Sequence, residues 1–262
     1  MWDRLDLLFS DVPDEWGTIE DFVNRFRNEW DTNQIIIGNA PVTTWDDLRN
    51  IEEHVINESF GFGRGTGVGR RIKRILNRLI SHSVFVNERS ENQVYLGEKI
   101  KGIKAGDVFV IDIFRLPPHT KSFVVGDVMR SIDELFGEKS KEELPAVIIL
   151  IDELNTFAPK SSKNALTKQI REIASKGRSR GTVLFGAEQF KSEVDEQIIG
   201  NCSVHAIGRT SGIEVKKPVY LLEESIKQSI TTLEKGELVL AFPTWRRPVK
   251  IIFPRPCCKK ME

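Results

Sequence analysis

The feature that most constrains the fold is a regular alternation of apolar strands and amphipathic helices after residue 106. Short aliphatic runs bounded by polar turns alternate with stretches whose apolar residues recur at helical spacing. Strands joined by helices in this way form right-handed crossovers and a mostly parallel sheet with helices on both faces, so the predicted fold class is α/β. The predicted strands are DVFVIDIF (107–114), AVIILI (146–151), TVLFGA (182–187) and VHAIGR (204–209), and the predicted helices span 120–135, 166–176, 194–199 and 223–233.

The first part of the chain is acidic and predicts a helical lobe. Residues 1–60 carry 14 acidic residues against 4 basic ones, although the whole chain is balanced at 38 of each sign. Helical spacing predicts two helices, at 18–30 and 44–56, the second opened by a capping box of Thr44 and Asp47. An acidic lobe on a basic body suits contact with nucleic acid or docking between subunits, or it is simply two solvated faces of different sign.

Short β-type runs frame the core. SVFV (83–86) and QVYL (93–96) precede the alternating region, and two apolar runs at 237–242 and 249–253 flank PTWRRP, which predicts a terminal β-hairpin. We therefore expect one main core with an appendage. The predicted division is an acidic helical lobe with a basic glycine-rich segment and its helix, residues 1–82, and an α/β core with the terminal hairpin, residues 83–262.

Polar residues follow two predicted neighbouring strands at the edge where open parallel sheets bind ligands. Asp152 and Glu153 come directly after VIILI, and Glu188 and Gln189 come after TVLFGA. Adjacent carboxylates at the end of a buried strand suit nucleotide hydrolysis, in which the aspartate holds a Mg²⁺ shell and the glutamate orients the attacking water. A solvated acidic turn is the plain alternative, and the glutamine alone is a weak signal.

Arginines end the helix between these two strands. Arg178 and Arg180 lie in the sequence KGRSRG, beside a glycine bend. Arginines presented in this way can reach into a neighbouring subunit's phosphate site or contact DNA phosphates. Cations are also favoured at the C-terminal end of any helix, which explains one arginine better than two.

These features in this order resemble the ATPase core of the HerA/FtsK superfamily, and specifically its HerA-like helicase branch. The similar stretches are VIILIDELNTFAP, LTKQIREIASKGRSRGTVLFGAEQF, VDEQIIGNCSVHAIGRTS and the closing LEKGELVLAF, within residues 105–256. The resemblance implies that Asp152 is the Mg²⁺-associated carboxylate, Glu153 the catalytic carboxylate and Gln189 the sensor. It further implies Arg178 as the first trans-acting arginine, Arg180 as the second and Arg209 as a lesser candidate.

The same resemblance implies a RecA-like P-loop fold, ATP and Mg²⁺ as cofactors, and a homo-oligomeric, usually hexameric ring that translocates DNA. Archaeal members of the branch work with the nuclease NurA in DNA-end processing. A NurA-type nuclease or another effector subunit is therefore an expected partner, together with DNA.

The sequence contains no phosphate-binding loop of the form GxxxxGK[ST]. The nearest spacing, Gly97 to Gly102, places Ile103 where lysine belongs, and the glycine cluster from residue 61 also fails. We therefore expect either the C-terminal portion of a HerA-like ATPase or a natural subunit that has lost its phosphate loop and serves in assembly. In both cases the chain alone should bind ATP poorly.

The basic segment 61–78 is a candidate DNA-facing or pore-facing element, because glycines let arginines approach phosphates closely. A connector followed by a solvated helix is the alternative. The hairpin tip at 245–247, Trp-Arg-Arg, could stack and pair similarly, although tips are commonly charged because they are exposed. The candidate DNA contacts are Arg64, Arg70, Arg71, Lys73 and Arg74.

Other chemistries have no support in the sequence. The three cysteines show no CxxC spacing, the four histidines form no HExxH motif, and no GxSxG elbow occurs. The N-terminus lacks a basic and then apolar leader, and the longest aliphatic run, Val147–Ile151, is far shorter than a membrane span. We expect a cytoplasmic protein that neither enters a membrane nor binds zinc.

Overall fold

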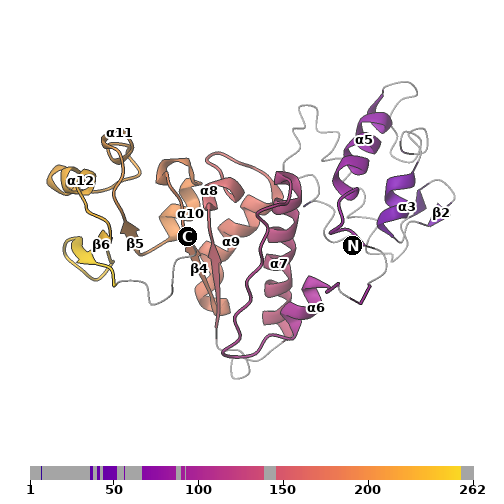
Figure 1. Cartoon of the computed structure of the whole chain (residues 1–262), viewed down its shortest axis with the longest axis horizontal. Coiled ribbons are helices and arrows are strands. Elements are labelled where there is room, and N and C mark those ends of the chain that lie inside the picture. The colour runs from indigo at the N-terminus through magenta and orange to yellow at the C-terminus, as the bar shows by residue number, and fades with distance from the viewer. Residues whose placement is uncertain are drawn as a thin grey trace. The chain divides into compact units, whose positions relative to one another are not determined.

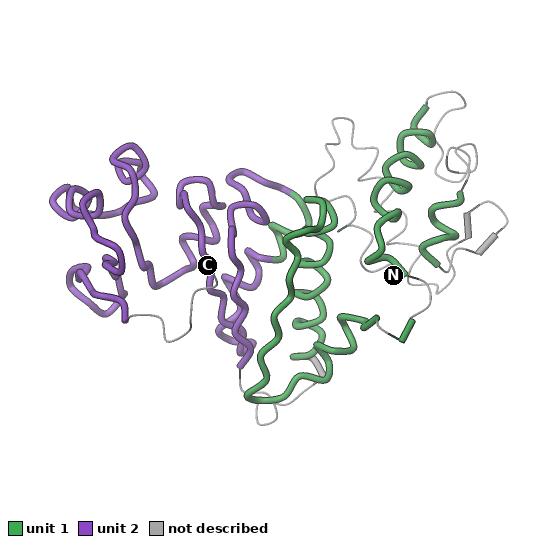
Figure 2. The backbone as a smooth tube through the Cα atoms, in the orientation of Figure 1, with its two compact units in different colours: residues 1–145, 164–169 green, residues 146–163, 170–262 purple. Residues whose placement is uncertain are grey.

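The computed structural model describes residues 44–51, 67–86, 90–91, 93–138 and 146–254, with residues 7, 36–37, 40–41 and 56. The chain divides into two compact units (Figure 1, Figure 2): unit 1 is residues 1–145 with 164–169, and unit 2 is residues 146–163 with 170–262. The predicted boundary after residue 82 falls inside unit 1. The predicted helix at 18–30, Arg64, Cys257 and Cys258 lie outside the described residues.

Unit 1 is mainly helical where it is described. Its elements are β1 (Ile36–Ile37), β2 (Ala40–Pro41), α3 (Trp45–Asn50), α5 (Val68–Ile80), α6 (Leu96–Lys101) and α7 (Pro118–Glu138). Unit 2 alternates strands and helices. Its elements are β3 (Val147–Ile151), α8 (Leu154–Phe157), β4 (Thr182–Gly186), η2 (Lys191–Glu193), α10 (Glu196–Asn201), β5 (His205–Ile207), α11 (Gly212–Val215), α12 (Glu224–Thr231), β6 (Glu237–Ala241) and β7 (Val249–Ile252). Helix α9 (Ala165–Arg180) begins in unit 1 and continues through unit 2.

The capping box predicted at the start of α3 is present. The Thr44 side chain accepts a hydrogen bond from the Asp47 amide at 3.1 Å, and the Asp47 carboxylate accepts one from the Thr44 amide at 2.9 Å. This reciprocal pair satisfies two of the amides that a helix start leaves unpaired. The helix is shorter than predicted and ends at Asn50.

Two of the predicted β-type runs are wrong. Residues 83–86 form no strand, because Phe85 is drawn into an aromatic cluster with Trp45 and Phe123, at centroid distances of 5.1 and 4.7 Å. The second run is also not a strand, because Leu96 begins α6, which packs along α7. Tertiary packing decides the secondary structure of both segments, as expected for short runs with a weak strand preference.

The predicted strand at 107–114 is also wrong. Its residues pair with no strand of the described chain, and Val108, Val110 and Phe114 are 86%, 89% and 82% exposed. A run that is apolar on both faces becomes a buried strand only when a neighbouring strand offers it a ladder. Here none of the described strands does so.

The heart of unit 2 is the parallel pair of β3 and β4. Val147 pairs with Thr182 and Ile151 pairs with Gly186, without a bulge between them. Helix α9 makes the crossover and runs four residues beyond its predicted end, through Arg180. Position 177, inside this helix, requires glycine, because a Cβ there would stand 2.6 Å from the carbonyl oxygen of Thr182. The chain then turns at Gly181, whose φ is +77°.

The strand predicted from VHAIGR exists but does not pair with β4. Strand β5 pairs antiparallel with β6, and β6 pairs antiparallel with β7, which confirms the predicted terminal hairpin. β5 pairs with β6 because Ile207 of β5 packs in a separate apolar core with residues of α11, α12 and β6. Its buried members are Ile207, Val215, Tyr220, Ile230, Leu233 and Val239.

None of the described helices combines the length and the apolar character that crossing a membrane would require.

Candidate functional site

The register of β3 and β4 brings the predicted polar residues to one edge. The ladder continues past both strands, since the Ala187 amide donates to the Ile151 carbonyl at 2.9 Å and the Leu154 amide donates to the Ala187 carbonyl at 3.0 Å. Residues 152–153 and 188–189 therefore lie beside each other at the carboxyl edge of the parallel pair. We call these four residues, Asp152, Glu153, Glu188 and Gln189, the strand-end rim.

The segments beyond the rim are also joined to each other. The Asp195 amide donates to the Ala158 carbonyl at 2.9 Å, and the Lys160 amide donates to the Glu193 carbonyl at 2.7 Å, around a β-bridge between Pro159 and Val194. Backbone hydrogen bonds thus hold the two loops together both before and after the rim. A site built this way keeps its geometry without help from a ligand.

Glu153 has a strained backbone. Its φ of +54° and ψ of 48° lie in the left-handed region, where a residue with a Cβ costs about 1–2 kcal/mol. Its amide donates to Asp152 Oδ1 at 3.0 Å, and its carbonyl accepts from Thr156 at 2.8 Å. Leu154 fits beside Gly186, where a Cβ would stand 2.4 Å from the leucine Cδ2. This close fit fixes the turn, and strain of this kind is concentrated at functional sites.

Titratable groups crowd the Glu188 side of the rim. The surrounding protein desolvates the Glu188 carboxyl and raises its pKa, which the nearby Lys191 ammonium partly opposes. Desolvation lowers the pKa of Lys191, whose Nζ lies 5.5 Å from the centre of the Tyr220 ring. Burial likewise raises the pKa of the Cys202 thiol and lowers that of His205. Lys191, Cys202 and His205 are half-buried, whereas the four rim side chains themselves are exposed.

A buried carboxylate anchors the turn that follows Gln189. Glu214 is 3% exposed, and it accepts hydrogen bonds from the Ser192 amide at 3.0 Å, the Ser192 hydroxyl at 2.8 Å and the Tyr220 hydroxyl at 3.2 Å. Burial alone would raise the pKa of Glu214, but these bonds and one from Lys217 lower it overall. The sequence carries one sign of this residue, the capping pattern Ser211-x-x-Glu214, which predicts a helix start but not burial.

An arginine clamp ties α9 to the start of α10. Arg171 donates to Asp195 through Nε at 2.9 Å and Nη2 at 2.6 Å, and Nη2 also donates to the Ser162 carbonyl at 2.6 Å. Asp195 is 4% exposed and caps α10 by accepting from the Gln197 and Ile198 amides. Sequence reasoning missed this pair, although Asp195 before a helical run is a recognisable N-cap signal.

The predicted trans-acting arginines are not at the rim. They lie at the C-terminal end of α9, which precedes β4, whereas the rim follows β4, so the strand separates them by about 13 Å. Arg178 is exposed and makes no hydrogen bond or ion pair among the described residues, whereas Arg180 lies 3.6 Å from Glu172. Arg209 is exposed after β5. From these positions neither Arg178 nor Arg180 can complete this chain's own rim.

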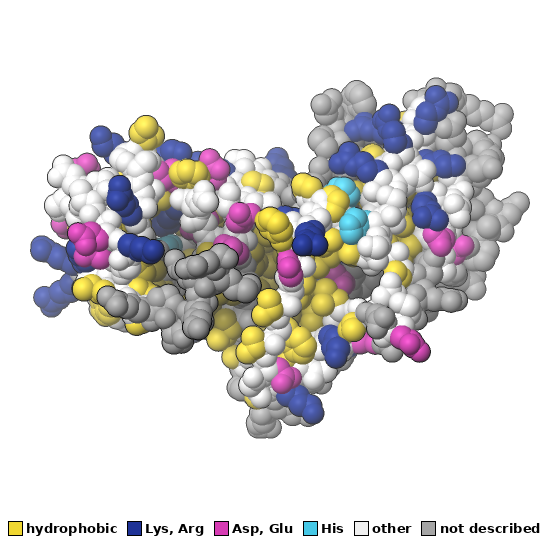
Figure 3. Space-filling model, viewed as in Figure 1, with side chains coloured by type: hydrophobic (Ala, Val, Ile, Leu, Met, Phe, Trp, Pro, Cys, Tyr) yellow, Lys and Arg dark blue, Asp and Glu magenta, His cyan; other side chains and the backbone are white. Residues whose placement is uncertain are grey.

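Apart from Arg64, which is outside the described residues, the candidate DNA contacts lie on α5. The apolar face of this helix is buried through Ile72, Leu76, Leu79 and Ile80, which leaves its cations on the opposite face. Figure 3 shows Lys and Arg side chains gathered over α5. Arg70 and Arg74 are exposed, whereas Arg71 and Lys73 are half-buried.

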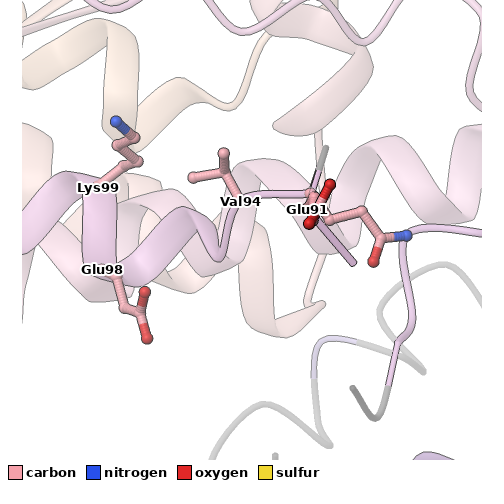
Figure 4. A pocket seen from close by; sticks show the side chains of 5 residues that line it. Glu91, Val94, Glu98 and Lys99 are labelled. Carbon is pink, nitrogen blue, oxygen red and sulfur yellow. The ribbon is translucent and has the colours of Figure 1, made fainter. Parts of the chain in front are cut away.

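Two hollows lie elsewhere. One, of about 370 Å³, is bordered by Glu91, Val94, Glu98 and Lys99, but Figure 4 shows Glu98 and Lys99 pointing to opposite sides of α6. The other, of about 280 Å³, borders α9 and α10 and includes Arg171. Neither is lined by a rim residue, and the four rim side chains are exposed.

The oxygen donors of the rim fit Mg²⁺. Mg²⁺ usually takes one or two protein carboxylates and fills its other positions with water and substrate phosphates. Asp152 Oδ1 is used by the Glu153 amide, which leaves Oδ2 without a protein donor among the described residues. In the same part of the chain, no three His, Cys, Asp or Glu side chains close around a metal, as a structural metal cage would require.

Comparison with known proteins identifies the fold. No family model matches this chain, and no curated protein matches its sequence. The bacterial conjugative coupling protein TrwBdeltaN70 is similar in structure over 97% of this chain and 68% of that chain, with a TM-score of 0.56 at 13% identity. This match confirms the predicted α/β class, a RecA-like P-loop-type fold, despite the differences in strand pairing described above.

Smaller matches are found with the genome packaging NTPase B204 from Sulfolobus turreted icosahedral virus 2. Its complex with sulfate matches with a TM-score of 0.40 at 12% identity, over 49% of this chain and 60% of that chain. Its complex with ATP-gammaS gives a TM-score of 0.39 at 10% identity, over 48% and 61%. This chain therefore spans about three fifths of the length of those NTPase chains.

Proposed function

We propose that the strand-end rim is the hydrolytic part of an ATP site in a DNA-handling ATPase of the HerA type. The observation that carries this proposal is the register that sets Asp152 and Glu153 beside Gln189 at one edge of the parallel pair. The fold shared with the coupling protein supports it, and so does the packaging NTPase, whose structures include ATP-gammaS.

The roles of the rim residues follow from their chemistry. Asp152 would hold Mg²⁺ through water, and the ion would neutralise phosphate charge. Glu153 accepts a hydrogen bond from the attacking water and orients it, and its strained backbone fixes the direction of the side chain. The Gln189 amide donates to a phosphate oxygen or holds the same water. These are the positioning and charge-stabilising parts that phosphoryl transfer needs.

The working form in this proposal is a homo-oligomeric ring, with six subunits as the expectation, that moves DNA in end processing or a related task. Arg178 supports the ring because it is exposed, lies far from its own chain's rim, and makes no hydrogen bond or ion pair among the described residues. It would act on the phosphates of an adjoining subunit. The cations of α5 would contact the DNA backbone, and a NurA-type nuclease is the proposed effector.

The test is ATP hydrolysis by the assembled protein in the presence of DNA. Replacing Glu153 by Gln removes the proton acceptor but keeps the side-chain shape, so kcat should fall by about 10²–10⁴-fold. A matched control, Glu224→Gln on the exposed first turn of α12, should leave kcat unchanged. Equal activity of both variants would refute a catalytic rim.

A second role, a non-catalytic assembly subunit that relies on another chain for phosphate binding, is favoured by a different observation. One face of the β3–β4 pair is apolar and uncovered, with Ile148, Leu150 and Phe185 exposed by 67%, 73% and 54%. Parallel strands are normally covered on both faces, so this surface suits another polypeptide. Full ATPase activity of the complex with Glu153→Gln would favour this role, and its collapse would favour catalysis by this chain.

A further inference from the structure

The tip of the β6–β7 hairpin carries an exposed aromatic pair. The Phe242 and Trp245 rings lie 5.5 Å apart between centroids, at an interplanar angle of 43°. A turn bond from the Trp245 amide to the Phe242 carbonyl, 3.0 Å long, holds them on one loop. Their side chains remain 40% and 43% exposed. Large rings that are held in place yet left in water commonly mark a binding surface.

Two cations follow this pair directly. Arg246 and Arg247 are exposed, and within the described chain neither makes an ion pair or a hydrogen bond from its side chain. The hairpin has no acidic residue between 238 and 254, and Lys250 neutralises Glu237 at its base over 2.7 Å. Lys and Arg side chains lie near β6 beside hydrophobic ones (Figure 3). The tip is therefore cationic and aromatic at once.

The tip is rigid. Four residue pairs, from Glu237 with Ile252 to Leu240 with Val249, form the antiparallel ladder beneath it. Pro243 and Pro248 restrict the backbone within the loop. A loop whose backbone is already restricted loses less conformational entropy when a partner binds.

We propose that this aromatic–arginine tip binds single-stranded nucleic acid. Unpaired bases would stack on Trp245 and Phe242, and the following phosphates would pair with Arg246 and Arg247. Bases in a duplex have no free faces for such rings, so the proposed ligand is an unpaired strand. An anionic membrane is the less suitable partner, because two half-exposed rings form a small apolar surface without an amphipathic helix behind it.

The experiment separates stacking from charge. Fluorescence anisotropy is measured, without nucleotide, on a labelled 12-residue oligothymidylate and on an abasic strand of the same length and charge. Trp245→Ala should weaken binding to the thymidylate about 5- to 150-fold and leave the abasic strand unchanged. Trp245→Phe, which keeps a ring, should restore most of the loss. Replacing both arginines by glutamine should weaken both ligands and reduce the slope of log K against log salt by about 1.4.

The controls are placed outside the tip. Phe253→Ala removes an aromatic side chain that is 59% exposed beyond β7, and it should bind as the wild type does. Equal affinity of the wild type for both strands, or an unchanged ratio in Trp245→Ala, would overturn the proposal. Binding to phosphatidylserine vesicles in place of the oligonucleotide would do the same. The binding experiment contains no nucleotide, so its failure would not bear on the proposed ATP site. In the same way, failure of the ATPase test would not bear on nucleic-acid binding by the tip.

Discussion

The ion pair between Arg171 and Asp195 gives the sharpest test of how the segments beyond the rim are held. One substitution at Asp195 removes the charge of the side chain and keeps its role as the N-cap of α10. Asp195→Asn keeps an oxygen that can cap α10 but removes the negative charge facing Arg171. Loss of one partner of a fully buried ion pair costs about 3–5 kcal/mol. The Arg171 side chain is 23% exposed and keeps its bond to Ser162, so we expect a smaller loss, about 2–3 kcal/mol.

Asp195→Ala also removes the cap, which is worth about 1 kcal/mol, so this variant should lose about 3–4 kcal/mol. The assay is urea unfolding followed by far-UV circular dichroism. The control is Glu196→Gln, the neighbouring acid, which pairs with Lys160 at 2.9 Å but is 69% exposed. An exposed pair contributes at most about 1 kcal/mol. Equal losses in Asp195→Asn and Glu196→Gln would refute the reasoning.

The pH dependence of the same comparison has a fixed sign. The hydrogen bond from Arg171 lowers the pKa of Asp195 in the folded protein below its ordinary value of 3.8. The stabilisation is therefore fully present well above pH 3.8 and is lost progressively as the pH falls through 3.8 and then through the lower folded value. The gap between the wild type and Asp195→Asn should be constant from neutral pH to about pH 5 and shrink below it. A gap that persists unchanged in strong acid would contradict the assignment.

Three further predictions follow from the backbone and the surface. At Glu153, glycine should be more stable than alanine by about 1 kcal/mol in urea unfolding, because φ is +54°, and the reverse order would contradict the strained turn. Gly177→Ala should destabilise by about 1–3 kcal/mol, because its Cβ would collide with a backbone carbonyl, whereas Gly200→Ala meets open space and should be neutral or stabilising. Replacing the two exposed candidates on α5, Arg70 and Arg74, by glutamine should reduce the salt slope of duplex DNA binding by about 1.8, and an unchanged slope would exclude α5 as a contact. The matched control replaces Lys216 and Lys235.

Local sequence was sufficient to predict the elements that build the rim. Five aliphatic residues running into Asp152, and a second strand running into Gln189, predict adjacent parallel strands because a helix of ordinary length joins them. The hairpin was predictable for a similar reason, since two apolar runs flank a proline-bounded turn. In both cases the signal lies within a few residues of the element that it specifies.

The remaining errors concern partners distant in sequence. The pairing of β5 with β6 depends on a core shared with α11 and α12, which no single strand reveals. The segment at 107–114 has strand composition but no described neighbour to pair with. Arg171 and Asp195 are 24 positions apart in the sequence, and Ser192 and Glu214 are 22 positions apart. The burial of Asp195 and Glu214 is therefore decided by tertiary packing.

The central claim, that the rim holds a metal-bound nucleoside triphosphate, is tested most directly by paramagnetic broadening. Mn²⁺ with ATP is titrated into the isotope-labelled full chain, and the amide resonances are followed by NMR. The account predicts weak binding that broadens residues 151–154 and 187–190 first and that Asp152→Asn abolishes. Broadening centred elsewhere in the chain, or the same broadening in Asp152→Asn, would contradict it.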